Sequence, residues 1–261
     1  MIFNHGPYAW LGNEMFQYAA VKALALRKGW EFKHFTRTNG MGEIFNVEES
    51  SLEDESYKDK FPLWMEGKHS YDPAINNLVD NYAVGGYLQS ERYFIDFKDE
   101  ILKDFTFKRD YGNGEDYQNY VSIHVRRGDY KTMIESLPLM PLEYYWEAIE
   151  VFAGCEFVVF SDDIPWCKEK FKGPQFKFMH HANDDSVYNK GRDLWAMSQC
   201  KHNIIGNSTF AWWGAYLNQK DRCVISPKNW FGPALNTLDQ SDKVPLDWIV
   251  LNNDLITDPS Y

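Results

Sequence analysis

The chain has 261 residues, enough for one large α/β domain or two smaller ones with a full hydrophobic core. Hydrophobic residues make up 44% and aromatic residues 17%, which excludes extended disorder. The formal net charge of −11 argues against general binding to nucleic acid or to an anionic membrane, because both need broad positive surface. Any phosphate site must therefore be a local concentration of cations.

The sequence holds no apolar run of the roughly 20 residues that a membrane helix needs, and its start lacks a basic segment followed by an apolar one. We therefore expect a soluble, cytoplasmic protein. The four cysteines are scattered without the paired spacing of metal ligands, so we expect free thiols and no metal.

The first predicted element is an amphipathic helix over residues 13–28, where apolar side chains recur at steps of three and four before a glycine. Gly12 and Asn13 lie at its amino end, where free N–H groups and the helix dipole favour an anion. A strand over residues 31–35 follows. Residues 39–68 are acidic and irregular, which predicts a solvated loop region.

From residue 119 onward strands and helices alternate, which predicts a parallel sheet with right-handed crossovers. The predicted strands cover residues 119–124, 156–160, 176–180, 203–205 and 222–226, and the predicted helices cover residues 141–153, 164–171, 192–199 and 208–217. A polar stretch around Gly112 is the predicted boundary between two domains, residues 1–112 and 113–261.

The strand at 119–124 runs into His-Val-Arg-Arg-Gly-Asp-Tyr at residues 124–130. Carboxyl ends of parallel strands form the edge where α/β sheets hold ligands, and the planar guanidinium group suits bidentate contact with phosphate. This segment is typical of a diphosphate clamp that uses Arg126 and Arg127. The alternative is a surface turn whose arginines pair with neighbouring acids.

The strand at 156–160 leads into Ser161, Asp162 and Asp163. A carboxylate there can accept hydrogen bonds from the N1–H and amino groups of guanine. A helix N-cap is the alternative, and for this segment alone it is the better supported one. The chain has no Asp-x-Asp spacing, which oxygen-ligand metal sites of nucleotide-sugar enzymes often use, so we expect metal independence.

Residues 206–213 read Gly-Asn-Ser-Thr-Phe-Ala-Trp-Trp and open the predicted helix at 208–217. Ser208 and Thr209 should cap this helix, which would leave its first N–H groups and hydroxyls available to a phosphate. The aromatic residues at helical spacing are typical of core packing.

These segments, in this order, resemble glycosyltransferase family 11, the α-1,2-fucosyltransferases. The matching segments are residues 11–19, 86–94, 124–130, 141–145, 160–166 and the stretch 193–217. The resemblance implies a GT-B-like α/β fold of two Rossmann-like halves, with parallel sheets flanked by helices. It further implies GDP-β-L-fucose bound mainly by the C-terminal half, and the acceptor side with the Gly12-Asn13 loop in the N-terminal half.

The implied reaction is inverting, metal-independent transfer of L-fucose to the 2-hydroxyl of a terminal galactoside, with no cofactor. The partners would be GDP-fucose and a galactose-terminated oligosaccharide or glycolipid, and a lipid-linked acceptor would place the enzyme at a membrane surface. Two alternatives stay open. One is a fucosyltransferase of another linkage, and the other is a catalytically silent nucleotide-sugar or glycan-binding protein of the same fold.

The resemblance also implies roles for individual residues. Arg126 would hold the β-phosphate with His124 nearby, and Asp129 would fix the loop or contact arginine side chains. Asn13 would face the pyrophosphate or the fucose. The full set of implied substrate-binding residues is Gly12, Asn13, Gln17, Arg127, Ser161, Asp162, Asp163, Asn207, Ser208, Thr209 and Phe210. Spacing does not identify a general base, for which Glu14, Asp129 and the acids at 183–185 remain candidates.

The chain departs from the family pattern near its start. Residues 7–10 read Pro-Tyr-Ala-Trp where relatives have a smooth apolar strand and two glycines, and Glu14 stands in a glutamine position. We therefore expect a short or irregular first strand. Trp10 should pack in the core, with a sugar-stacking platform as the alternative.

Overall fold

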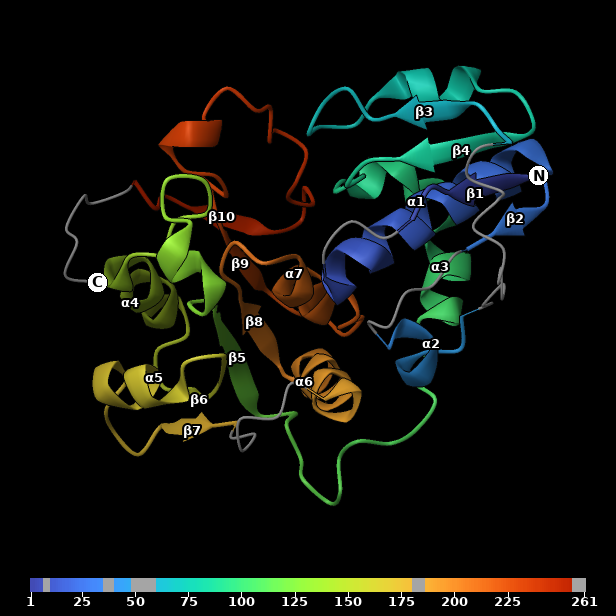
Figure 1. Ribbon diagram of the computed structural model, residues 1–261. Helices are drawn as coiled ribbons and strands as arrows, with labels where there is room; N and C mark the ends of the chain where they lie inside the picture. Colours follow the sequence, from blue (N-terminus) through green and yellow to red (C-terminus); the bar gives the residue numbers. More distant parts are fainter. Residues whose placement is uncertain (7–9, 35–39, 48–59, 180–185, 255–261) are drawn as a thin grey trace. The chain divides into compact units, whose positions relative to one another are not determined.

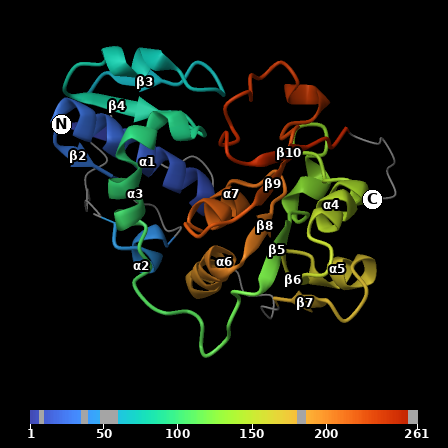
Figure 2. The same ribbon diagram turned by 180° about the vertical axis from the view of Figure 1, so that it is seen from behind.

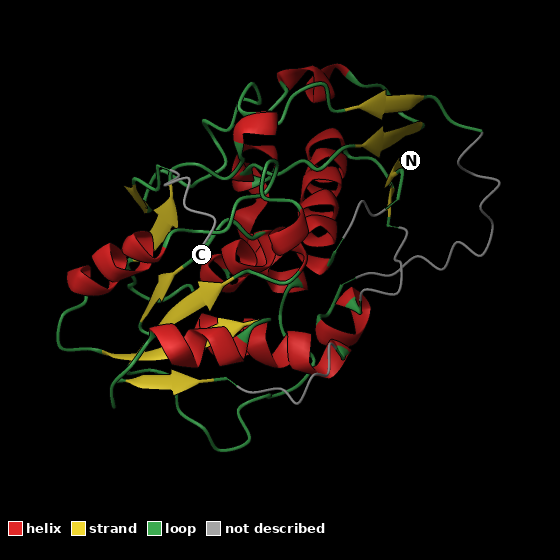
Figure 3. Cartoon of the chain, turned by 60° about the vertical axis from the view of Figure 1, so that its left-hand side comes forward, coloured by secondary structure: helices red, strands yellow, loops and turns green. Residues whose placement is uncertain are grey.

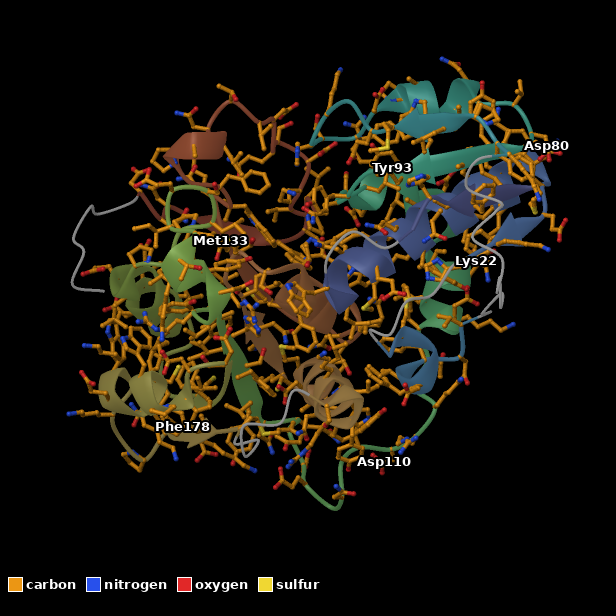
Figure 4. All side chains as sticks on the ribbon, viewed as in Figure 1. Lys22, Asp80, Tyr93, Asp110, Met133 and Phe178 are labelled. Atoms are coloured by element: carbon orange, nitrogen blue, oxygen red, sulfur yellow. The ribbon has the colours of Figure 1, made fainter. Side chains whose placement is uncertain are left out.

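The computed structural model describes residues 1–6, 10–34, 40–47, 60–179 and 186–254. The chain forms two compact units, each built on a parallel sheet (Figure 1). One comprises residues 1–109 with 239–245, and the other comprises 110–238 with 246–261, so that Asp110, labelled in Figure 4, begins the second unit. Residues 239–245 thus belong to the first unit, whereas the sequence-based division placed them in the second.

The first unit contains a four-stranded parallel sheet in the order β2-β1-β4-β3. Its strands are β1 (Ile2–Asn4), β2 (Phe32–Lys33), β3 (Leu63–Met65) and β4 (Tyr82–Gly85). Helix α1 (Leu11–Lys28) connects β1 to β2 and ends at Gly29, whose φ of +66° is the left-handed conformation predicted for a glycine stop. The helix begins two residues earlier than expected, with Trp10 in the N-cap position.

Short elements complete the first unit: α2 (Met41–Ile44), α3 (Lys98–Asp104) and the 3-10 turns η2 (Pro73–Asn77), η3 (Glu91–Tyr93) and η4 (Ile95–Phe97). The prediction of a loop over residues 39–68 is wrong where the structure describes them, because α2 and β3 form there. Both elements are too short for a periodic pattern to reveal them. The core prediction for Trp10 is also wrong, since this side chain is 60% exposed.

The second unit contains a six-stranded parallel sheet in the order β10-β9-β8-β5-β6-β7. The strands are β5 (Tyr120–Val125), β6 (Glu156–Ser161), β7 (Phe176–Phe178), β8 (His202–Ile204), β9 (Val224–Pro227) and β10 (Ile249–Leu251). Helices α4 (Leu142–Val151) and α5 (Ile164–Lys170) cover one face, and α6 (Val187–Gln199) and α7 (Thr209–Tyr216) cover the other (Figures 1 and 2). The short turns η5 (Asp129–Thr132) and η6 (Pro233–Leu235) lie in its loops.

The alternation of strands and helices predicted from residue 119 onward is confirmed (Figure 3). Helix α6 starts at Val187 instead of residue 192 because Ser186 caps it, accepting a hydrogen bond from the N–H of Asn189 at 3.3 Å. Strand β10 was not predicted, since an edge strand of three residues gives little pattern.

Strand order in the second unit reverses between β5 and β8, because the chain winds first toward β7 and then back past β5 toward β10. Such a switch point leaves a crevice outside the carboxyl ends of the central strands, where open α/β sheets hold ligands. Beneath it, β5 places Val121, Ile123 and Val125 in a core shared with Tyr144 and Tyr145 of α4. Among the described residues, none of the helices combines the length and apolar character needed to cross a membrane.

Candidate functional site

The candidate site lies at the carboxyl ends of three adjacent strands in the second unit. Strand β5 is hydrogen-bonded to β6 on one side and to β8 on the other. The predicted segments 124–130, 161–163 and 206–210 follow these strands in turn, so the fold brings them to the switch point together.

Arg126 is held between two carboxylates at this edge. Its Nη1 lies 2.7 Å from Oδ2 of Asp162, and its Nη2 donates to Oδ1 of Asp129 over 2.7 Å. Its guanidinium carbon lies 5.5 Å from the ring centre of Tyr130, within cation–π range. The side chain remains 29% exposed, and a guanidinium has five N–H donors, so further donors are available to a ligand.

The loop after β5 is hydrogen-bonded to Asp162. The backbone N–H of Arg127 donates to Oδ1 of Asp162 over 2.9 Å. Gly128 follows, and a Cβ atom at this position would lie 2.5 Å from Oδ2 of Asp162. Only glycine permits so close an approach, which explains why the motif carries a glycine between its arginines and Asp129.

Arg127 turns away from Arg126 and is almost fully buried. Its Nε donates to Oδ2 of Asp163 over 3.2 Å, and its guanidinium lies 3.9 Å from the ring centre of Trp166. Asp163 is the N-cap of α5, because its Oδ1 accepts from the N–H of Trp166 at 3.3 Å. The helix N-cap predicted as the alternative for residues 161–163 is therefore formed by Asp163. Ser161 supports it by accepting a hydrogen bond from the Asp163 N–H at 2.9 Å.

The charges at this edge are balanced. Lys131 adds a third cation by donating to Oδ2 of Asp163 over 2.6 Å. Burial alone would raise the pKa of Asp163, but hydrogen bonds from Lys131, from the Trp166 N–H and from Arg127 outweigh burial and lower it. Three cations thus meet the carboxylates of Asp129, Asp162 and Asp163. A phosphate group would bind the N–H donors of Arg126 that these carboxylates leave unused, and it would compete with Asp129 and Asp162 for the positive charge of the guanidinium.

His124 is buried at the end of β5, beside the ring of Phe210 at a centroid distance of 6.0 Å. Burial lowers the pKa of His124 to about 4, with Asp162 opposing the shift and Arg126 reinforcing it. The imidazole is therefore neutral at pH 7. It supplies hydrogen-bonding capacity at the site but no positive charge.

Asn207 joins the loops around β8. Its side-chain nitrogen donates to the backbone oxygens of Pro138 and Trp230 over 3.0 and 3.1 Å, and its own backbone oxygen accepts from the Tyr130 hydroxyl over 3.0 Å. Ser208 occupies the N-cap position of α7, as predicted. Its side chain makes no capping hydrogen bond, so that part of the prediction is wrong.

Thr209 begins helix α7, and Phe210 follows within its first turn. Trp212 and Trp213 lie fully in the core, as their helical spacing predicted.

The remaining predicted residues belong to the first unit, within the first turns of α1. Gly12 and Gln17 are buried, and Asn13 is half-buried. The side-chain oxygen of Asn13 accepts a hydrogen bond from Nε2 of Gln89 over 2.7 Å. Glu14, a candidate base, is 0% exposed and lies 3.5 Å from the equally buried His34. The other candidates at 183–185, like residues 7–9, lie outside the described residues.

Sequence reasoning missed several residues that shape the site. Lys131 directly follows the motif, and Tyr130 ends it, so proximity in sequence was the available signal. Tyr144 and Tyr145 of α4 lie far from the motif in sequence. They donate from their hydroxyls to the backbone oxygens of Ile205 and His124 over 2.6 and 3.3 Å, which fixes the ends of β8 and β5.

Two units, each with a parallel sheet flanked by helices, have the architecture of the GT-B-like fold. The structure is similar to that of the NodZ α-1,6-fucosyltransferase from Bradyrhizobium, crystallised and soaked with GDP-fucose, with a TM-score of 0.51 and 13% sequence identity. The match covers 83% of this chain and 92% of NodZ. The predicted fold class is thereby confirmed.

The chain belongs to glycosyltransferase family 11, whose sequence model, described as "Glycosyl transferase family 11", matches residues 2–252. It is 30% identical to an α-1,2-colitosyltransferase of Escherichia coli, over 92% of this chain and 95% of that protein. It is 28% identical to galactoside α-(1,2)-fucosyltransferase 2 of Rattus norvegicus, over 83% of this chain and 67% of that protein. The family predicted from the sequence is confirmed.

Proposed function

We propose that the protein transfers L-fucose from GDP-β-L-fucose to the 2-hydroxyl of a terminal galactoside, with inversion and without a metal ion. The observation that carries this proposal is the partly exposed Arg126 at the switch point of a family 11 chain. Relatives named as α-1,2-transferases of fucose and colitose support the linkage.

Departure of GDP builds negative charge on the β-phosphate as the sugar gains oxocarbenium character, so stabilising that charge is the main task of the site. Arg126 would do this with the donors that Asp129 and Asp162 leave unused. Because these carboxylates hold the guanidinium in place beforehand, little reorganisation is needed when the phosphate arrives. Ser208, Thr209 and Phe210 would line the nucleotide.

Guanine recognition by Asp162 or Asp163 is part of this proposal, and the contacts of the two residues constrain it. Asp163 already accepts from the N–H of Trp166, from Arg127 and from Lys131. Asp162 already accepts from the N–H of Arg127 and pairs with Arg126. Each carboxylate has about four lone-pair positions, so Asp162 retains the larger accepting capacity.

Asp129 is the general-base candidate that the structure favours. Its side chain is 37% exposed and adjoins the guanidinium of Arg126, whereas Glu14 is fully buried in another unit. A base has to come within hydrogen-bond reach of the acceptor hydroxyl, and an exposed carboxylate beside the phosphate site meets that requirement.

A second candidate function is α-1,2 transfer of colitose, favoured by the match to the colitosyltransferase over nearly the full length of both chains. Colitose is fucose without its 3-hydroxyl, so the two donors differ by one hydrogen-bonding group. A site that pairs with this hydroxyl would reject the deoxy sugar strongly, whereas a site without a partner for it would not.

The test is acceptor-dependent release of GDP from GDP-fucose and from GDP-colitose, across an array of galactosides. We expect faster release from GDP-fucose, and only when a galactoside is present. Faster release from GDP-colitose would select the second candidate. Binding of GDP-fucose without release under any condition would identify a silent binding protein. Cytoplasmic location and the glycolipid or oligosaccharide nature of the acceptor stay predictions.

A further inference from the structure

Three polar side chains in the first unit form a hydrogen-bonded row that ends at Asn13. Nζ of Lys243 donates to Oε1 of Gln89 over 2.6 Å, and Nε2 of Gln89 donates to Oδ1 of Asn13 over 2.7 Å. The three residues come from the returning segment 239–245, the loop after β4 and the first turn of α1. Lys243 is only 1% exposed.

The chemistry of the groups gives this row a direction. An ammonium group has donors and no acceptor, so the atom of Gln89 that meets Lys243 has to be its oxygen. The amide nitrogen of Gln89 therefore faces Asn13, and the atom of Asn13 that accepts this hydrogen bond has to be its side-chain oxygen. The NH₂ group of Asn13 is left on the opposite side. Within the described part of the chain, this nitrogen makes no hydrogen bond.

The charged end of the row is held firmly. Burial lowers the pKa of Lys243 to about 8 while Glu66 and Asp242 oppose the shift, so the amine is charged at pH 7. Glu66 accepts from the hydroxyl of Tyr93, labelled in Figure 4, over 2.8 Å. Asp242 accepts from the backbone N–H of Tyr71 over 2.8 Å, which ties the returning segment to the first unit.

We propose that Gln89 and Lys243 are positioning residues that orient the amide of Asn13 so that its NH₂ group donates to an oxygen of the sugar nucleotide. This inference rests on the proposed function and on the role that the family resemblance implies for Asn13, which is to face the pyrophosphate or the fucose of GDP-fucose. The acceptor atom is a phosphate oxygen or a sugar hydroxyl oxygen. A donor fixed in advance binds without first giving up rotational freedom, which improves affinity.

The Gln89→Glu variant tests the direction of the row without changing its shape. A carboxylate only accepts, so it would accept from Lys243 and also from the NH₂ group of Asn13. Asn13 would then present its oxygen to the sugar nucleotide. We expect KM for GDP-fucose to rise about tenfold to a hundredfold, the size of one lost and unpaired hydrogen bond. Gln118→Glu is the matched control, because it makes the same change from amide to carboxylate at an exposed position. It should leave KM unchanged.

A double-mutant cycle separates positioning from a structural effect. In the Asn13→Ala background, Gln89→Glu should cause no further rise in KM, because the amide it reorients is gone. An equal rise in both backgrounds would overturn the proposal. Lys243→Gln is the second variant, since an amide in this place permits both orientations of Gln89, and we expect a smaller rise in KM than for Gln89→Glu.

Side-chain amide NMR of asparagine-labelled protein at pH 7 tests the row without any turnover. In the unaltered chain the NH₂ protons of Asn13 should exchange quickly with water, and in Gln89→Glu one of them should become protected. Unchanged exchange in the variant would overturn the proposal. If the unaltered chain transfers no fucose, the proposed function fails, while this measurement still decides whether the row orients Asn13.

Discussion

Arg126 is held by Asp129 and Asp162 and still has donors for a ligand. Replacing it with alanine should reduce kcat/KM with GDP-fucose by about a hundredfold or more, the usual cost of one charged donor at a developing oxyanion. Steady-state kinetics with a melting curve measures this. Near-normal turnover in a folded Arg126→Ala variant would refute the clamp.

Arg127 is the matched control for that variant, because it is locked between Asp163 and Trp166. Arg127→Ala should lower the free energy of unfolding by about 1–3 kcal/mol, from the loss of a hydrogen bond to a carboxylate and of a cation–π contact, while Asp163 keeps Lys131 and the Trp166 N–H as partners. The folded fraction should keep most of its turnover per molecule. A large loss of kcat with unchanged stability would assign Arg127 to the chemistry instead.

Asp129 competes with phosphate for Arg126 and is also the proposed base, so its two roles predict opposite effects. Asp129→Asn removes the competing charge and should tighten GDP binding severalfold in calorimetry. The same variant should lower kcat by about a hundredfold, a typical contribution of a general base. Weaker GDP binding would contradict the competition between carboxylate and phosphate.

Strand β5 carries a pH-sensitive group in His124, whose pKa burial lowers from 6.5 to about 4. Between pH 6.5 and 4 the unfolded chain binds a proton that the folded chain does not, so stability is lost as pH falls through this window. Urea unfolding from pH 7 to 4 should show this loss. A His124→Asn variant should show a shallower slope, and identical slopes would mean that folding does not lower the pKa of His124.

Helix, strand and turn signals predicted most of the second unit, because β5, β6 and β9 are largely apolar runs and amphipathic helices alternate with the strands. They also placed Arg126, Asp162 and Ser208 at one edge, since parallel strands share their carboxyl ends. The row from Lys243 to Asn13 was beyond prediction, because its members lie far apart in sequence and only the fold brings them together. The exposure of Trp10 was missed because aromatic residues are usually buried.

Across the whole chain, nothing in the sequence has the Asp-x-Asp spacing, and Arg126 offers the charge that a metal would otherwise supply. Transfer should therefore survive exhaustive treatment with a chelator. Activity that is lost on chelation and restored by Mg²⁺ or Mn²⁺ would contradict this.

The guanine proposal predicts that GDP binds more tightly than ADP or UDP, because neither adenine nor uracil offers the adjacent N1–H and amino donors of guanine, and losing hydrogen bonds to a carboxylate costs about 1–3 kcal/mol. Calorimetry of the three nucleotides with the unaltered chain and with Asp162→Asn and Asp163→Asn measures it. Asp162→Asn should lose most of the preference, since Asp162 has the larger remaining capacity to accept. Equal affinities in the unaltered chain would remove the argument for a guanine nucleotide.

The position at which fucose is attached tests the central claim most directly. The protein should be incubated with GDP-fucose and a terminal β-galactoside, with Arg126→Ala as the control, and the product linkage determined by NMR. The predicted result is an α-linked fucose on the 2-hydroxyl of galactose, formed by the unaltered chain and nearly absent with the variant. Fucose attached at another hydroxyl, or equal product from both proteins, would contradict the claim.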